Sequence, residues 1–198
     1  MFWFGRRMRR QVPFETQIEV LAKCGIRLRA DCTTEEVRIA LGCPSHEAKP
    51  YVDLLLALGG EVELEVPVRY FSDDVWHFDT ECIEDDGDYG RIVQQVMRLA
   101  KGQLPLTDIR DRFDFDHQQA WIEVQLDGAT QRYEPVFNND WADPLVFVWL
   151  GDLIAARGGA GRLVYFAPGD QSLLIGYVTP EQVQHLRKTT GIKLRLLP

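Results

Sequence analysis

The sequence AWIEVQLDGATQRYEPVF, residues 120–137, decides the fold class. Asp127 and Gly128 interrupt two strand-forming runs, and this dipeptide suits the positive backbone angles of a tight hairpin turn. We therefore expect two antiparallel strands here, over residues 120–126 and 129–137.

Helices and further strands alternate irregularly through the last two thirds of the chain. The expected elements are strands at 61–66, 75–83 and 109–115, helices at 89–100 and 144–157, strands at 162–167 and 172–178, a helix at 180–189 and a strand at 192–197. Because hairpins join several of these strands, the order favours an α+β fold over a doubly wound parallel sheet. We expect a mixed, mainly antiparallel sheet with packed helices.

The first third of the chain is expected to be helical. Apolar residues recur at helical spacing from Phe14, and Gly25 ends this first helix. Thr33 and Glu36 have the types and spacing of a capping box, which predicts a second helix. The run 51–58 is apolar almost all round and predicts a buried third helix.

Length and composition limit the organisation of the chain. Its 198 residues are 45% hydrophobic and 26% charged, as in globular proteins. We expect a single α+β domain over 13–198, with a helical subregion at 13–60, after a basic and flexible segment at 1–12. No apolar run approaches membrane-spanning length, and four irregularly spaced cysteines predict reduced thiols. A cytoplasmic protein without stable membrane insertion is the resulting prediction.

Two helix starts carry specific predictions. Asp86 or Asp88 is expected to cap the helix that follows them. Asp143 is expected to cap the helix at 144–157, with Pro144 at the first position, where proline loses no needed hydrogen bond. That helix is apolar on nearly every face, so it is either fully buried or covers the partner in a homodimer.

Charge is distributed unevenly along the chain. The net charge is −8, yet residues 31–90 carry sixteen acids against three Lys or Arg. Between Asp73 and Asp88, eight carboxylates occupy sixteen residues and alternate with large apolar side chains, which indicates that the charge lies on folded structure. Such a field disfavours nucleic acid as a partner and favours a basic protein surface or a cation.

The residue spacing argues against most cation sites. With Gly87 at the sixth position of a calcium loop, Cys82 would stand at the first position, where an oxygen ligand is needed. Asp79 and Glu81 could share one face of a strand and, together with Asp86, hold a divalent metal. However, no lysine that would activate water follows them closely.

Nucleophilic and zinc chemistry are supported no better. Cys43 and His46 could supply two zinc ligands, with Cys24 and Cys32 also available, but packing as small core residues explains these cysteines equally well. His77 and Cys82 are five residues apart on one expected strand, so they would point to opposite faces. We therefore assign no catalytic residue, no cofactor and no metal ligand.

A second segment, 138–143, again mixes acids and amides with an indole before a helix. Trp141 either fills a pocket on a partner or packs against the helix that follows it. Acids and indoles on loops are the residue types that a protein-binding patch would use to meet a basic partner. The residues expected to contact that partner are Asp73, Asp74, Trp76, Asp79, Glu81, Glu84, Asp85, Asp86, Asp88, Asp140 and Trp141.

FDTECIEDDGDY (78–89), NNDWADP (138–144) and the closing strand, turn, strand and TPEQ helix resemble stretches of small bacterial cytosolic proteins of unassigned function. Size, acidity, α+β make-up and the missing catalytic motif resemble immunity proteins, which neutralise toxins delivered between competing bacteria. The resemblance implies a non-enzymatic acidic protein that inhibits a basic toxin, for example a nuclease, through residues 71–88. The alternative is a metal-dependent hydrolase that uses Asp79 and Glu81.

Overall fold

The computed structural model describes residues 11–42, 50–62 and 68–197. In this part of the chain, six helices and nine strands form, and the strands lie in three antiparallel sheets. The predicted α+β class, with a helical N-terminal region, is confirmed.

The helices are α1 (Phe14–Lys23), α2 (Thr34–Leu41), α3 (Val52–Gly59), α4 (Asp88–Ala100), α5 (Leu145–Ala156) and α6 (Pro180–Thr190). The strands are β1 (Glu61–Val62), β2 (Arg69–Tyr70), β3 (Val75–Asp79), β4 (Thr107–Asp114), β5 (Gln119–Leu126), β6 (Ala129–Tyr133), β7 (Arg162–Phe166), β8 (Ser172–Val178) and β9 (Arg195–Leu196). The sheets have the strand orders β1-β2, β3-β8-β7-β9 and β4-β5-β6.

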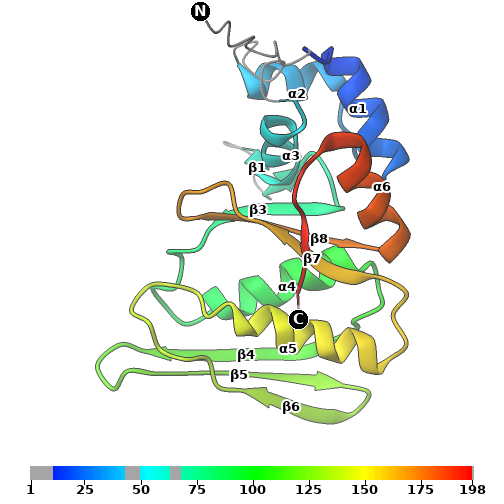
Figure 1. Cartoon of the computed structure of the whole chain (residues 1–198). Coiled ribbons are helices and arrows are strands. Elements are labelled where there is room, and N and C mark those ends of the chain that lie inside the picture. The colour runs from blue at the N-terminus through cyan, green and yellow to red at the C-terminus, as the bar shows by residue number, and fades with distance from the viewer. Residues whose placement is uncertain (1–10, 43–49, 63–67, 198) are drawn as a thin grey trace, which may run out of the picture.

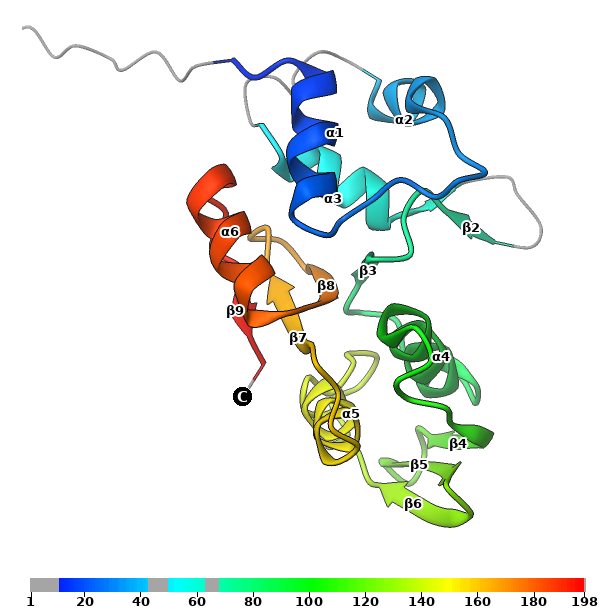
Figure 2. The same ribbon diagram turned by 90° about the vertical axis from the view of Figure 1, so that its right-hand side faces the viewer.

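The four-stranded sheet lies in the middle of the molecule and is buried on both faces. Successive residues of a strand point to opposite faces, and here they enter different hydrophobic clusters. Leu163 and Ile175 belong to the cluster shared with α4 and α5, whereas Val164 and Leu174 belong to the cluster shared with α1 and α3. Helices therefore cover both sides of this sheet (Figures 1 and 2).

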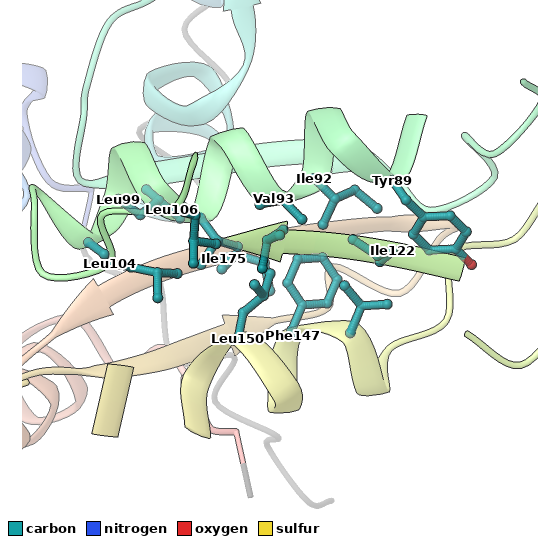
Figure 3. Close-up of a cluster of buried hydrophobic side chains, with 14 of the residues drawn as sticks. Tyr89, Ile92, Val93, Leu99, Leu104, Leu106, Ile122, Phe147, Leu150 and Ile175 are labelled. Carbon is teal, nitrogen blue, oxygen red and sulfur yellow. The ribbon is translucent and has the colours of Figure 1, made fainter. Parts of the chain in front are cut away.

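The sheet β4-β5-β6 forms an outer layer beyond α4 and α5, so that layers of helices and strands alternate through the molecule (Figure 2). Figure 3 shows the core between these layers, where Ile92 and Val93 of α4 meet Phe147 of α5 and Ile122 of β5. The apolar stripe predicted for α4 from its helical spacing is confirmed, because Ile92, Val93 and Val96 are fully buried.

Three local predictions are confirmed by backbone geometry. Thr33 and Glu36 form both hydrogen bonds of the capping box at the start of α2. Asp127 and Gly128 have φ angles of 52° and 80°, as a primed hairpin turn requires. The Asp143 carboxylate accepts the Leu145 amide, the first amide of α5, at 2.9 Å as expected of a cap, although the N-cap position is Pro144, one residue later than predicted.

Four strand predictions need correction or fall outside the described residues. The strand expected over 129–137 ends at Tyr133. The strand expected over 75–83 ends at Asp79, because the next residues pair with two other loops rather than with β8. The closing strand is limited to β9. Of the strand expected at 61–66, the described part of the chain contains Glu61–Val62, which form β1. Of the N-terminal segment 1–12, it contains the last two residues.

The apolar helix α5 is largely covered by its own chain. Val146, Phe147, Leu150 and Ile154 are buried in the core, and Trp149 stacks on Tyr133 of β6 with ring centroids 5.3 Å apart. Burial within the chain thus explains its composition, and homodimerisation stays a prediction.

Candidate functional site

Four connecting segments meet at one end of the molecule, which we call the acidic end. They are residues 79–88 after β3, 114–118 between β4 and β5, 134–143 between β6 and α5, and 167–172 between β7 and β8. Figure 1 shows all four at its left-hand side. These segments carry twelve Asp or Glu residues and no Lys or Arg. Asp143 is buried, and the other eleven acids are at least partly exposed, so folding concentrates negative charge from distant parts of the sequence on one surface.

Backbone hydrogen bonds hold three of these segments side by side. The Thr80 amide donates to the Gln171 carbonyl at 2.9 Å, and the Ala142 amide donates to the Thr80 carbonyl at 2.8 Å. The Ile83 amide donates to the Asp140 carbonyl at 2.9 Å. The two acidic segments singled out in the sequence thus run next to each other, although about sixty residues separate them.

The fourth segment, 114–118, is attached through the end of β4, the strand before it, which is hydrogen-bonded to a carboxylate of the loop after β3. Asp86 accepts the Phe113 amide at 2.7 Å and an Arg112 guanidinium hydrogen bond at 2.8 Å. These donors lower the pKa of Asp86, the Phe113 amide being the larger cause. Asp86 is therefore a structural link between the loop after β3 and the strand β4.

Helix α4 is not capped as expected, because neither Asp86 nor Asp88 accepts a hydrogen bond at its first turn. Its N-cap is Gly87, with φ of 103°, and the Gly87 amide donates to Asp111 of β4 at 2.8 Å. Burial raises the pKa of Asp111, and the backbone amides that it accepts oppose this rise. Asp88 instead accepts the amides of Glu84 and Asp85, and so closes the loop before the helix.

Three of the predicted partner-binding residues lie away from the acidic end, at the start of β3. Trp76 is only 2% exposed and stacks on Phe78 with ring centroids 3.8 Å apart. Asp74 is buried and accepts the Arg27 amide at 2.7 Å, and Asp73 pairs with Arg29 at 3.0 Å. The prediction of Trp76 as a surface anchor is wrong, because its place in β3 turns it toward the core.

The remaining predicted acids divide into two groups. Asp79, Asp86 and Asp88 accept hydrogen bonds from the chain itself; those to Asp79 come from the Glu81 amide and the Gln171 side chain. The second group is Glu81, Glu84, Asp85 and Asp140, whose side chains make no hydrogen bond or ion pair with the described residues. Only this second group has its full charge and all its acceptor oxygens available to a partner.

Apolar side chains lie among these acids. Phe115 and Val136 are 59% and 64% exposed, and the Phe115 ring lies 5.6 Å from that of Phe137. Trp141 is half-buried and forms an isolated antiparallel bridge with Glu81. The sequence analysis missed Phe115 and Val136, since both were placed inside strands. An aromatic residue between Asp114 and Asp116, next to a turn, was the available signal.

Metal and thiol chemistry find no support in the described residues. Across 11–42, 50–62 and 68–197, no three His, Cys, Asp or Glu side chains are placed to hold a metal ion. Burial raises the pKa of Cys82 to about 11, which makes its thiol a poor nucleophile. The possible zinc ligands Cys43 and His46 lie outside the described residues, so the zinc alternative is untested.

No protein-family model, curated protein or solved structure matches this chain. Within the part that the structure describes, no helix is long and apolar enough to cross a bilayer.

Proposed function

We propose that the chain is a non-enzymatic binding protein whose acidic end covers a basic surface of a partner protein. The observation that carries this proposal is the convergence of four segments with eleven at least partly exposed carboxylates and no Lys or Arg. A surface of one sign attracts and orients a partner of the opposite sign, and it repels acidic competitors.

The mixture of side chains favours a protein as the partner over a small cation. Glu81, Glu84 and Asp85 offer separate carboxylates rather than a converging ligand shell. Phe115 and Val136 add exposed apolar area, which a hydrated cation would not bury but a protein surface would. Charges around an apolar centre resemble the arrangement of many binding hot spots.

We further propose that the partner is a bacterial toxin, and that the chain acts as its immunity protein. A toxin that cleaves nucleic acid binds phosphates with Lys and Arg, and carboxylates can occupy the same positions. This finer proposal rests on the resemblance in size, acidity and α+β make-up. A metal-dependent hydrolase that uses Asp79 and Glu81 stays a prediction; calorimetry showing no heat of binding for manganese, magnesium or calcium would remove it.

The test removes charge from the acidic end without touching acids that hold the fold. We would capture partners from the native host with the wild type and with the triple variant Glu81→Gln, Glu84→Gln, Asp85→Asn. A control triple removes three other exposed acids: Glu19→Gln, Asp108→Asn and Asp152→Asn. The dissociation constant of any captured basic protein should rise at least about tenfold in the first triple.

The control triple should bind that partner nearly as the wild type does, and added salt should weaken binding of the wild type most. Equal retention of the partner by the wild type and the first triple would refute the proposed surface. Inhibition of a captured toxin by the wild type, but not by the first triple, would support the role as an immunity protein.

A further inference from the structure

A second charged region lies at the other end of α4. There an open surface cavity of about 440 Å³ lies between the start of β3, the loop after α1 and the last turn of α4. Its lining residues are Arg27, Leu28, Arg29, Asp73, Asp74, Arg98 and Lys101. Since α4 has 13 residues, it separates this cavity from the acidic end by about 20 Å.

The cavity is positively charged although the chain as a whole is negative. Four Arg or Lys residues line it against two Asp residues, whereas the net charge of the chain is −8. A third carboxylate, Asp31, lies outside the lining and accepts two hydrogen bonds from Arg29, both at 2.9 Å, so the local excess is one positive charge. Arg27 is exposed, and its side chain makes no hydrogen bond or ion pair with the described residues. Lys101 pairs with Asp74, which leaves two of its three donors available.

Arg98 is held in a fixed position by neutral groups. Its guanidinium donates to the Ser72 carbonyl at 2.8 Å and the Val75 carbonyl at 3.3 Å, and lies 4.1 Å from the ring centroid of Tyr70. Its nearest carboxylate, Asp73, is 3.5 Å away. The two carbonyl oxygens accept hydrogen bonds from the Arg98 guanidinium but carry no net negative charge. The positive charge of Arg98 therefore stays available to attract an anion.

One carboxylate already shows that an oxyanion fits between two of these cations. An oxygen of Asp73 lies 3.0 Å from Arg29 and 3.5 Å from Arg98. The Asp73 side chain is 42% exposed, so it can turn toward solvent when a competing anion arrives. A phosphate carries more charge and more acceptor oxygens than one carboxylate, which favours the exchange.

We propose that this cavity binds a small phosphate-bearing anion, with Arg29 and Arg98 below the phosphate and Arg27 and Lys101 at the rim. Two nitrogens of the Arg29 guanidinium donate to Asp31, so Arg29 offers a phosphate the third nitrogen, which now binds Asp73. The planar guanidinium of Arg27 has no such partner and matches the geometry of phosphate oxygens. Leu28 gives the cavity an apolar contact for the organic part of a phosphomonoester. This site is separate from the acidic end and does not depend on the function proposed for it.

Isothermal titration at constant ionic strength would test the site with inorganic phosphate, pyrophosphate and glycerol phosphate, and with chloride as the reference anion. The wild type should bind the phosphates saturably. Arg27→Gln should weaken this binding at least about fivefold, because it removes one charged donor from the rim. The matched control Lys188→Gln removes an exposed charge elsewhere and should leave binding unchanged.

Asp73→Asn supplies a test of opposite sign. It removes the competing negative charge from the cavity, so phosphate should bind more tightly, by about fivefold or more. A variant that merely damaged the fold would bind less, and thermal unfolding of each variant would detect such damage. Phosphate binding that does not saturate, or that is equal in Arg27→Gln, Lys188→Gln and the wild type, would overturn the proposal. Tighter binding of glycerol phosphate than of inorganic phosphate would identify a phosphomonoester as the ligand; the reverse order would identify free phosphate.

Discussion

Gly59 is the position where one added methyl group tests how α3 packs on the central sheet. A Cβ atom at Gly59 would lie 2.8 Å from the His77 amide nitrogen and 3.0 Å from the Trp76 carbonyl carbon. Both atoms belong to the backbone of β3, which is paired along its length with β8. Neither can move away without disturbing that pairing, so Gly59→Ala should destabilise the protein.

The expected loss follows from two opposing effects. Forcing an extra methyl group into a packed contact costs about 1–3 kcal/mol. Alanine is favoured over glycine inside a helix by up to about 1 kcal/mol, but Gly59 is the last residue of α3 and gains less. The net loss should be about 1–2 kcal/mol, or roughly 2–8 °C in Tm for a chain of this size.

Gly151→Ala in α5 is the matched control. Its Cβ atom would meet only the Cδ1 atom of Leu163, at 3.7 Å, which is an ordinary van der Waals contact. Because Gly151 lies in the helix interior, this variant should be more stable than the wild type by about 0.5–1 kcal/mol. Urea unfolding followed by tryptophan fluorescence measures both values. Equal or greater stability of Gly59→Ala, with an unchanged m-value, would refute the close approach of α3 to β3.

Three further predictions concern individual buried or half-buried side chains. Burial lowers the pKa of His77, so the unfolded chain binds a proton at this residue more readily than the folded chain does. As the pH is lowered below about 6.5, the free energy of unfolding should therefore decrease, and it should decrease less in His77→Gln. Urea unfolding at several pH values measures both. Asp143→Ala should cost on the order of 3 kcal/mol, because the amides of Val136 and Leu145 and the Tyr133 hydroxyl lose their acceptor, and Asp143→Asn should cost less. Cys82 should react with iodoacetamide at least about tenfold more slowly in the folded protein than in the unfolded chain, because its pKa is raised. Mass spectrometry of the peptide that contains Cys82 measures both rates, and equal rates would contradict the raised pKa.

The features predicted correctly from the sequence are those that neighbouring residues determine. The hairpin turn at Asp127 and Gly128 follows from their backbone preferences, and the capping box of Thr33 and Glu36 from a spacing of three residues. The buried stripe of α4 follows from helical periodicity. These patterns were sufficient for the α+β class, because hairpins imply antiparallel sheets.

Pairings between distant residues explain what the sequence could not show. Residue spacing gave no sign that Asp111 would accept the Gly87 amide, or that the Phe113 amide would use Asp86. Such contacts turn some acids of the 73–88 cluster into structural groups and leave others free. Trp76 was misplaced for a related reason: β3 is buried on both faces, so alternation along the strand does not produce an exposed side.

Helix α4 accounts for part of the charge separation between the two ends of the molecule. A helix favours negative groups at its N-terminus and positive groups at its C-terminus. In α4, Asp88 and Asp111 lie at the N-terminal end, and Arg98 and Lys101 lie at the C-terminal end. Hence these residues would be expected even in a protein that binds nothing.

The helix does not account for the charged side chains that make no hydrogen bond or ion pair within the described chain. Glu81, Glu84, Asp85 and Asp140 at one end, and Arg27 at the other, neither cap α4 nor neutralise an opposite charge. Each would repel its like-charged neighbours in the absence of a ligand, which makes folding slightly less favourable. The two proposed binding functions would give these residues a physical reason. Their substitution, rather than that of Asp86 or Arg98, is therefore the change that separates recognition from stability.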